Sequence, residues 1–451
     1  MTSPLFSFLS ATRSALLHVS PSTRPSSSLT LVLGNPSADL DSFISALVFA
    51  YFYSTNFKQD NTRRLFLPIL NLPVTPSSEL WRFRPEFRTV LELSLRSSQN
   101  HEHYESVLQQ LVTIADIRSA AGSPFRRLFL SQGSKDTSSD EKTNMVLVDH
   151  NTLSIPTVEI REVANKVSVV ACIDHHDDEG FVLSHASPRI IRTGIGSCTS
   201  LVVKHLRDQK IWQSTENVGA LFELAKLALA PILIDTANLT AEGKVSQTDR
   251  EVVAFLESEI LPHLGSESSG SESWNRDDFY KAIAESKNKS LDFLTIGEIL
   301  DRDYKEWNET TNHKCQLQLG ISSCVKPLGW LIDRADSVEA FQNEIDEFAR
   351  AEPRHLSIFG LMTAFTSEDG TFKRELLVVA FDEAGTQVLQ RFNGSASRTL
   401  RLEPWNDRPE LLEPAGKLQE DGAKIRVWAQ GDVSQSRKQV APILRSSVKE
   451  T

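Results

Sequence analysis

Short apolar runs alternate with longer segments of helical periodicity along the first part of the chain. Four runs are apolar almost throughout: LTLVL (29–33), RLFLPIL (64–70), MVLVD (145–149) and VSVVACID (167–174). Strands of this kind are buried on both faces, which is typical of parallel sheets flanked by helices. The pattern therefore predicts an N-terminal doubly wound parallel α/β domain.

Three other apolar segments lie outside these runs. The run SFISALVFAYFY (42–53) is shorter than the roughly 20 residues that cross a bilayer, so we expect a buried helix and no membrane insertion. In LALAPILIDTANL (227–239), Pro231 leaves open whether the segment is a helix or a strand. The first 38 residues contain no acidic residue and faintly resemble a mitochondrial transit peptide, but we favour a helix, PLFSFLSATRSALLHV (4–19), that packs on the domain.

A polar, glycine- and serine-rich stretch, GSESSGSES, divides the chain. It predicts a flexible linker at 265–273, a first domain at 1–264 and a second domain at 274–451. In the second domain the runs at 355–365 and 374–381 are predicted to be strands, which indicates a smaller α/β domain. The polar loop SQGSKDTSSDEKT, shortly before the third strand of the first domain, is expected to be a surface insertion.

Composition is that of an ordinary globular protein, with 40% hydrophobic and 24% charged residues. The length of 451 residues exceeds the roughly 250 to 300 residues at which single cores stop growing, which favours two domains. The net charge of −11 gives no general support for nucleic-acid binding. Four scattered cysteines without a CxxC pair suggest a reducing compartment, so we expect a cytoplasmic protein, with mitochondria as the alternative. We also favour a monomer.

Acidic and imidazole side chains follow the predicted strands. Asp39 and Asp41 come after the first run, Asp149 ends the third, His175 follows the fourth, and Asp235 lies within the run at 227–239. The carboxyl ends of parallel strands meet at one edge of the sheet, where ligands bind. Carboxylates that share a pocket cannot all stay ionised without cations. Two divalent ions, Mg²⁺ or Mn²⁺, would neutralise them, and such a pair suits phosphoryl chemistry.

The order of these motifs resembles that of a known family. The series NPSADLDS, LVDHN, CIDHHDDEG, GSCTSLV and LIDTANL resembles the DHH phosphoesterase superfamily, in the branch that contains family II pyrophosphatases, exopolyphosphatases and prune-type proteins. DYKEW (303–307) and SRKQVAP (436–442) resemble the DHHA2 domain of that branch. The resemblance implies an active site in a cleft between a DHH domain and a DHHA2 domain.

The resemblance also implies a set of metal ligands. Asp39 and Asp149 are expected to bind one metal, and Asp41, Asp149, His175 and Asp235 the second, so that Asp149 bridges the two ions.

Three further residues of the motifs are expected to support these ligands or to contact the substrate. Asp174 and His150 would orient the ligands. His176 would contact a substrate phosphate as a hydrogen-bond donor or acid. Asp149 and His176 are therefore the predicted catalytic residues.

Asn35 stands where the pyrophosphatases of this family have a histidine. An amide oxygen is a weaker and harder ligand than imidazole, so we expect the first metal site to work with Mg²⁺. Prune-type proteins often carry arginine where this chain has His176. The combination of Asn35 and His176 favours an exopolyphosphatase.

Basic residues of the second half match phosphate-binding positions of the family. Lys305, Arg437 and Lys438 are expected to hold substrate phosphates. His313 and Lys314 either extend this path for a longer chain or form a solvent-facing turn. The expected reaction is hydrolysis of the terminal phosphate of inorganic polyphosphate. The alternatives are hydrolysis of pyrophosphate, short polyphosphates or nucleoside tetraphosphates, and a prune-like scaffold with little turnover.

Overall fold

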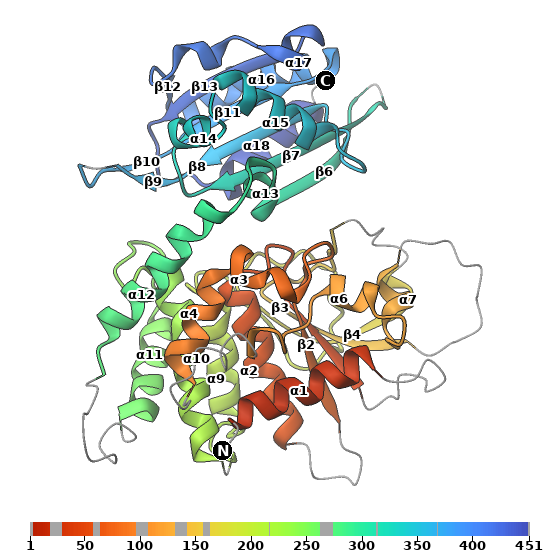
Figure 1. Cartoon of the computed structure of the whole chain (residues 1–451), viewed down its shortest axis with the longest axis vertical. Coiled ribbons are helices and arrows are strands. Elements are labelled where there is room, and N and C mark those ends of the chain that lie inside the picture. The colour runs from red at the N-terminus through yellow and green to blue at the C-terminus, as the bar shows by residue number, and fades with distance from the viewer. Residues whose placement is uncertain are drawn as a thin grey trace. The chain divides into compact units, whose positions relative to one another are not determined.

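The computed structural model divides the chain into two compact units, Met1–Asp292 and Phe293–Thr451 (Figure 1). The structure describes residues 3–18, 29–56, 64–95, 107–130, 142–156, 163–215, 217–261, 274–312, 314–367 and 369–449. Within this described part, every helix falls short of the length or apolarity that a membrane crossing requires.

A five-stranded parallel sheet forms the centre of the first unit. Its strands are β1 (Leu29–Leu33), β2 (Leu65–Ile69), β3 (Thr143–Val148), β4 (Val167–Asp174) and β5 (Arg189–Ile191), in the order β2-β1-β3-β4-β5. All four neighbouring pairs are parallel. The predicted doubly wound parallel domain is therefore confirmed, with each of the four apolar runs in its own strand.

Helices cover both faces of this sheet because successive strand residues point to opposite sides. Val32, Val146 and Ile173 belong to one apolar core, and Leu31 and Leu147 belong to the other. The first core contains residues of α2 (Leu40–Asn56), α4 (Pro85–Ser94), α9 (Cys198–Asp208), α10 (Val218–Asp235), α11 (Gln247–Ile260) and α12 (Arg276–Lys289). The second contains residues of α6 (Ile114–Ser119) and α7 (Arg126–Phe129). The short elements η1 (Ser77–Glu79) and α3 (Leu80–Phe83) precede α4.

The N-terminal segment forms helix α1 (Pro4–Leu17), which packs on the first unit. Leu5 and Leu9 are 0% and 1% exposed and lie in the core beside α2. Ser3 caps the helix and also donates a 2.7 Å hydrogen bond to the buried carboxylate of Glu223 in α10. The favoured interpretation of this segment as a packed helix is confirmed.

The segment 227–239, for which helix and strand were both open, is helical as far as Asp235. Pro231 lies inside α10, which is buried along most of its length. Asp235 is therefore delivered by the C-terminal end of a helix, and the expectation that it follows a strand is wrong. The physical reason is that α10 is surrounded by other helices, whose packing outweighs the single hydrogen bond lost at proline.

The structure places the boundary between the units after α12, at Asp292 and Phe293. The sequence had placed it at the stretch 265–273, which lies outside the described residues. Ile283 of α12 is fully buried in the core of the first unit, and Ser286 hydrogen bonds to Thr89 of α4 at 2.8 Å. The helix after the polar stretch thus belongs to the first unit because its apolar face has a partner there.

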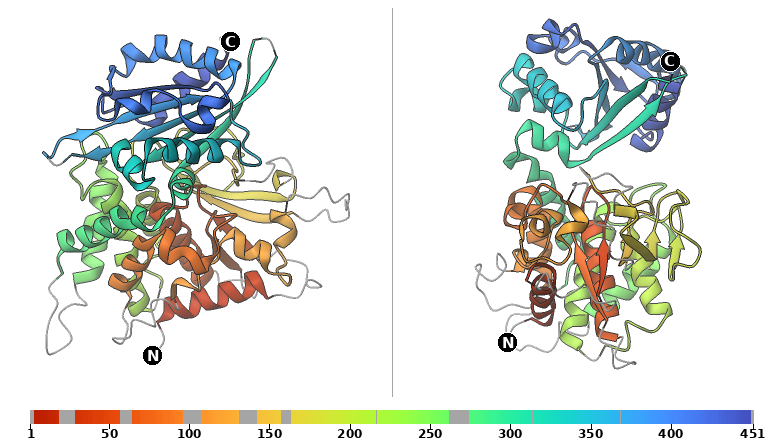
Figure 2. Two further views of the ribbon diagram at one scale, coloured as in Figure 1. Left: turned by 45° about the horizontal axis from the view of Figure 1, so that its top comes forward. Right: turned by 90° about the vertical axis from the view of Figure 1, so that its right-hand side faces the viewer.

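The second unit is a smaller α/β domain with a mixed sheet, seen from two sides in Figure 2. Its strand order is β12-β13-β11-β8-β7-β6, with β7 and β8 parallel and the other pairs antiparallel. The predicted strands at 355–365 and 374–381 correspond to β8 and β11. The strands are β6 (Tyr304–Thr310), β7 (Gln316–Cys324), β8 (Ile358–Thr363), β11 (Glu375–Ala380), β12 (Leu402–Pro404) and β13 (Lys424–Gln430), and β9 (Phe365–Thr366) and β10 (Phe372–Lys373) form a separate hairpin.

Helices flank this second sheet as well. Residues of α16 and α18 share one apolar core with the strands, and α13 packs against β7 and α15. The helical elements are α13 (Ile296–Arg302), α14 (Leu328–Arg334), α15 (Val338–Arg350), α16 (Glu383–Thr399), η4 (Pro409–Leu412), α17 (Gly416–Glu420) and α18 (Arg437–Lys449), and η3 (Ser290–Phe293) spans the boundary between the units.

Candidate metal centre

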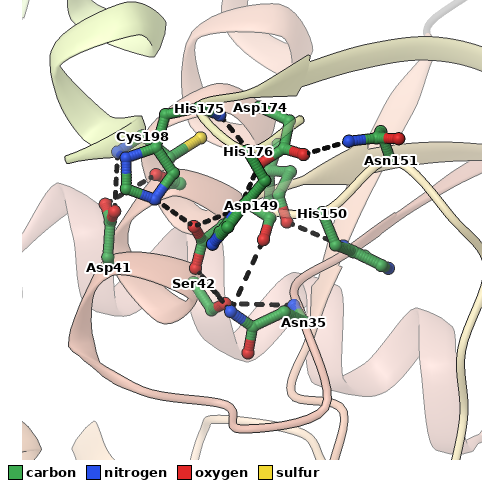
Figure 3. Close-up of polar contacts among 12 residues, drawn as sticks. Asn35, Asp41, Ser42, Asp149, His150, Asn151, Asp174, His175, His176 and Cys198 are labelled. Atoms are coloured by element: carbon green, nitrogen blue, oxygen red, sulfur yellow. Dashed lines mark hydrogen bonds and ion pairs between the residues drawn. The ribbon is translucent and has the colours of Figure 1, made fainter. Parts of the chain in front are cut away.

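Asp149, His175 and His176 gather at the carboxyl edge of the parallel sheet (Figure 3). Asp149 directly follows β3, and the two histidines directly follow β4, which pairs with β3. One ligand atom from each of the three side chains lies within 4.8 Å of the others. The parallel pairing of two strands thus brings together residues that are 26 positions apart in the chain.

Asp149 lies at the centre of this cluster and is 2% exposed. Its φ of 62° places a residue with a Cβ in the left-handed region, and its N–H donates to the carbonyl of Ile173 at 3.0 Å. Its Oδ2 accepts 2.7 Å hydrogen bonds from Ser42 Oγ and Asn35 Nδ2, and its Oδ1 lies 3.2 Å from His175 Nε2. The carboxylate is therefore held by residues of the loop between β1 and α2, of the first turn of α2 and of the segment after β4.

The electrostatic environment of Asp149 disfavours its charge. Burial, followed by the negative charges of Asp41 and Asp39, raises the pKa of Asp149 to about 7, although the hydrogen bond with His175 opposes the shift. A carboxyl group in this position gains from a nearby cation, which would favour the ionised form.

His175 presents its Nε2 atom to Asp149. Its Nδ1 lies 3.0 Å from the carbonyl of Ile195, and because a carbonyl only accepts, Nδ1 must carry the proton of that hydrogen bond. Burial alone would lower the pKa of His175, but the hydrogen bond and charge of Asp149 raise it to about 10. Because Nδ1 donates to Ile195, Nε2 is the nitrogen that could bind a metal, after loss of the proton that it shares with Asp149.

His176 is oriented by Asp174, the last residue of β4. Its Nδ1 lies 2.8 Å from Asp174 Oδ1 and 4.0 Å from Asp149 Oδ1. Asp174 is fully buried and also accepts from Asn151 Nδ2 at 2.5 Å. Burial alone would raise the pKa of Asp174, but the hydrogen bonds and charge of its partners hold it at about 2. Asp174 therefore orients the ring of His176, and its expected role in orienting metal ligands stays a prediction.

Asp39 and Asp41 flank the start of α2. Asp39 Oδ1 accepts from the N–H of Ser42 at 3.1 Å and so caps the helix. Asp41 is 3% exposed and accepts from the N–H groups of Cys198 and Thr199 at 2.6 and 2.9 Å, at the N-terminus of α9. The helix N-terminus stabilises this buried carboxylate.

Asp235 belongs to the same group of charges. Burial, then the charge of Asp41, raise its pKa well above the ordinary value, with further contributions from Asp39 and Asp149 and an opposing one from Lys287 of α12. Asp149 and Asp235 therefore share a largely buried region with two further acidic residues, and a nearby cation would favour the ionised forms of these two carboxyl groups. The donor set of carboxylate oxygens and one imidazole nitrogen fits a divalent metal of the Mg²⁺ or Mn²⁺ type.

Asn35 and His150 make contacts other than those that the sequence suggested. The amide oxygen of Asn35 accepts from the N–H groups of Ser37 and Ala38 at 2.8 and 3.2 Å, and its Nδ2 donates to Asp149. Asn35 therefore presents its amide N–H group to the cluster, whereas its amide oxygen was expected to be a metal ligand. His150 Nδ1 donates to the carbonyl of Val148 at 2.9 Å, so this nitrogen orients a backbone turn.

The predicted phosphate-binding residues lie in the second unit. Arg437, at the start of α18, donates to the carbonyl and to Oδ1 of Asp303, both at 2.6 Å. Lys305 lies two residues further on in β6 and is exposed, as is Lys438. Lys314 is exposed in the turn between β6 and β7, and His313 lies outside the described residues.

Several residues that hold the cluster were not among the predicted site residues. They are Ser42, Asn151, Ser197 and Thr199, which donate to Asp149, Asp174 or Asp41. Asn151 could have been found, because it follows Asp149 and His150 at the end of a strand. The serine and threonine residues lie inside the motifs NPSADLDS and GSCTSLV, but residue type alone did not single them out, since hydroxyl groups are common at helix starts.

The protein has a two-domain α/β fold and a buried cluster of carboxylate and imidazole groups at the edge of a parallel sheet. This combination is typical of phosphoesterases, and comparison with known proteins supports that class. The model of the "DHH family, N-terminal domain" matches residues 30–232, and the model of the "DHHA2 domain" matches residues 281–447. The chain belongs to the DHH phosphoesterase superfamily, in the branch with a C-terminal DHHA2 domain.

Individual relatives extend over most of the chain. A protein of Schizosaccharomyces pombe named "Putative exopolyphosphatase" is 31% identical over 447 residues, which cover 97% of this chain and 95% of the relative. "Exopolyphosphatase PRUNE1" of Rattus norvegicus is 23% identical over 424 residues, which cover 93% of this chain and 75% of that protein. A crystal structure of a "putative family II inorganic pyrophosphatase" from Methanococcus jannaschii aligns with a TM-score of 0.47 at 16% identity, covering 93% of this chain and 99% of that one.

Proposed function

We propose that this protein is a metal-dependent exopolyphosphatase that releases orthophosphate from the end of inorganic polyphosphate. The observation that supports it most is the buried cluster of Asp149, His175 and His176, surrounded by the charges of Asp39, Asp41 and Asp235. Two relatives named as exopolyphosphatases, which align over more than nine tenths of the chain, support this choice of substrate.

Two divalent cations, when bound by these carboxylates and His175, would neutralise them and activate a water for in-line attack on the terminal phosphorus. Asp149 would be the ligand shared by both ions, because it lies at the centre of the cluster. Asp39 would complete the first site, and Asp41, His175 and Asp235 the second.

His176 would act on the substrate. Asp174 fixes its ring through Nδ1, which leaves Nε2 to hold a proton beside a phosphate oxygen. When the bond between the terminal phosphorus and the bridging oxygen breaks, this proton can pass to the leaving oxygen. Lys305, Arg437 and Lys438 would bind the phosphates of the remaining polymer.

A phosphate-release assay tests the proposal. Long polyphosphate, tripolyphosphate and pyrophosphate are each supplied with Mg²⁺ or Mn²⁺, and orthophosphate is measured. We expect release from long polyphosphate. Release from pyrophosphate alone would indicate a pyrophosphatase, and release from tripolyphosphate alone a short-chain hydrolase. Absence of release from every substrate would favour a scaffold protein.

Replacing the central carboxylate provides a direct test of the metal centre. Asp149→Ala should abolish orthophosphate release without unfolding the protein, because the substitution removes a buried carboxyl group whose charge is disfavoured in the metal-free state. Asp178→Ala is the matched control, since Asp178 lies in the loop after β4, is exposed and pairs with Arg189. Wild-type turnover in Asp149→Ala would remove this residue from the proposed site.

A further inference from the structure

The loop between β1 and α2 carries Asp39 and Asp41 in a strained conformation. Ala38 has a φ of 43°, in the left-handed region that residues with a Cβ seldom adopt. Its N–H closes a turn by donating to the carbonyl of Asn35 at 3.0 Å. A Cβ at Gly34 would lie 2.8 Å from Ser42 Cβ, so the loop also passes unusually close to the first turn of α2. Such a conformation persists only where surrounding groups hold it.

Arg84 supplies one of these groups. It is 5% exposed and precedes α4 directly. Its Nε donates to the carbonyl of Ala38 at 3.1 Å, and its second terminal nitrogen donates to the carbonyl of Ser37. These two carbonyls flank Ala38 on either side, so a single rigid guanidinium that binds both restricts the φ and ψ angles between them.

Arg84 is itself held by the packing of α4 on α2. The rings of Phe87 in α4 and Phe43 in α2 are fully or almost fully buried, with centroids 4.5 Å apart. This ring contact ties the segment that carries Arg84 to the helix that Asp39 caps and whose first turn contains Asp41.

We propose that Arg84 is a positioning residue for the metal centre. By locking Ala38 in its left-handed conformation, Arg84 sets the direction in which the next residue, Asp39, projects, and so sets metal affinity without touching metal or substrate. This inference rests on the metal centre proposed above.

Binding of Mn²⁺ to the metal-free protein, followed by the electron paramagnetic resonance signal of the free ion, measures the effect apart from turnover. Arg84→Gln should weaken Mn²⁺ binding about 10- to 100-fold, as loss of a group that orients a ligand typically does. Arg118→Gln is the matched control, because Arg118 also donates to two backbone carbonyls, those of Phe129 and Pro73, at 2.9 and 3.0 Å. Both variants should lose thermal stability, and only Arg84→Gln should lose affinity.

The outcomes separate the two proposals. If wild type itself binds no Mn²⁺, the metal centre is wrong and the inference falls with it. If wild type binds Mn²⁺ and Arg84→Gln binds it as tightly as Arg118→Gln, only the role of Arg84 is wrong. If Arg84→Gln does not fold, Arg84→Lys decides, since lysine keeps the charge but cannot hold both carbonyls in one plane. Wild-type affinity in Arg84→Lys would then overturn the inference, and weaker binding would support it.

Discussion

At the scale of single residues, strained backbone conformations and unfavourable buried charge gather around Asp149 in the first unit. Ala38 and Asp149 both have positive φ, and the pKa of Asp149 is raised by burial and by its acidic neighbours. Backbone strain and buried charge persist where other interactions offset their unfavourable free energy, and both are common at functional sites. Hydrogen bonds from Asn35, Ser42 and His175 partly offset them here.

The donor role of Asn35 leads to a prediction. Asn35→Asp should lower the stability of the metal-free protein by about 1 to 3 kcal/mol, because it replaces a hydrogen bond to Asp149 with a second carboxylate. Added Mn²⁺ should then raise the thermal midpoint of the variant more than that of wild type. Asn35→Ala, which loses the hydrogen bond without adding charge, is the control. An equal Mn²⁺ effect in Asn35→Asp and Asn35→Ala would contradict the prediction.

His205, away from the cluster, should make stability depend on pH. Burial lowers the pKa of His205, whose Nε2 lies 2.8 Å from the hydroxyl of Tyr53. Its contribution to stability is therefore full above the unfolded pKa of about 6.5 and decreases as pH falls below it, since the unfolded state binds the proton more readily. The thermal midpoint should fall more in wild type than in His205→Gln between about pH 8 and about pH 5. Parallel curves for the two proteins would exclude this contribution.

At the scale of elements, the position of a helix or strand in the core decides what the residue at its end can reach. Asp149 and His175 meet because β3 and β4 are parallel neighbours. Asp235 approaches the same region from the C-terminal end of α10, which packs on α2. The cluster is thus assembled from residues at the ends of strands and of a helix. The apolar runs of the sequence did not by themselves show which segments are strands and which is a helix.

Helix α1 should contribute measurably to the stability of the first unit. Leu9→Ala should lower the free energy of unfolding by about 2 to 5 kcal/mol, because Leu9 is 1% exposed and its loss leaves a cavity in the core. Ser10→Ala, on the exposed side of the helix, should change it by less than about 0.5 kcal/mol. Urea denaturation measures both variants. A similar small effect of the two substitutions would mean that α1 does not pack as described.

At the scale of the whole molecule, the two units divide the proposed chemistry. The candidate metal ligands named above all lie in Met1–Asp292, and the candidate phosphate-binding residues Lys305, Arg437 and Lys438 all lie in Phe293–Thr451. Metal binding and substrate binding should therefore respond to different substitutions.

Arg437→Gln tests this division. It should lower kcat/KM for polyphosphate about 100-fold, as removal of one charged donor typically does, and leave Mn²⁺ affinity unchanged. Arg408→Gln is the control, because Arg408 also forms an ion pair in the second unit, with Asp333 at 2.7 Å. Loss of Mn²⁺ binding in Arg437→Gln, or unchanged kcat/KM, would contradict the division.

The sequence was sufficient to predict four of the five strands of the first sheet, all except the short β5, and most residues of the cluster. Continuous apolarity is a local property of a buried strand, and the acids and histidines stand directly after such runs in β3 and β4. Residue type and order along the chain carry this information, so no tertiary structure was needed for Asp149, His175 and His176.

Only the tertiary structure decided the features that depend on distant partners. It made the segment around Pro231 a helix, because other helices surround it, and it assigned α12 to the first unit through the burial of Ile283. It turned the donor of Asn35 toward Asp149, because two backbone N–H groups occupy the amide oxygen. It also brought Arg84 to Ala38, across 46 positions of the chain. These features follow from packing between segments far apart in the chain, which no local pattern records.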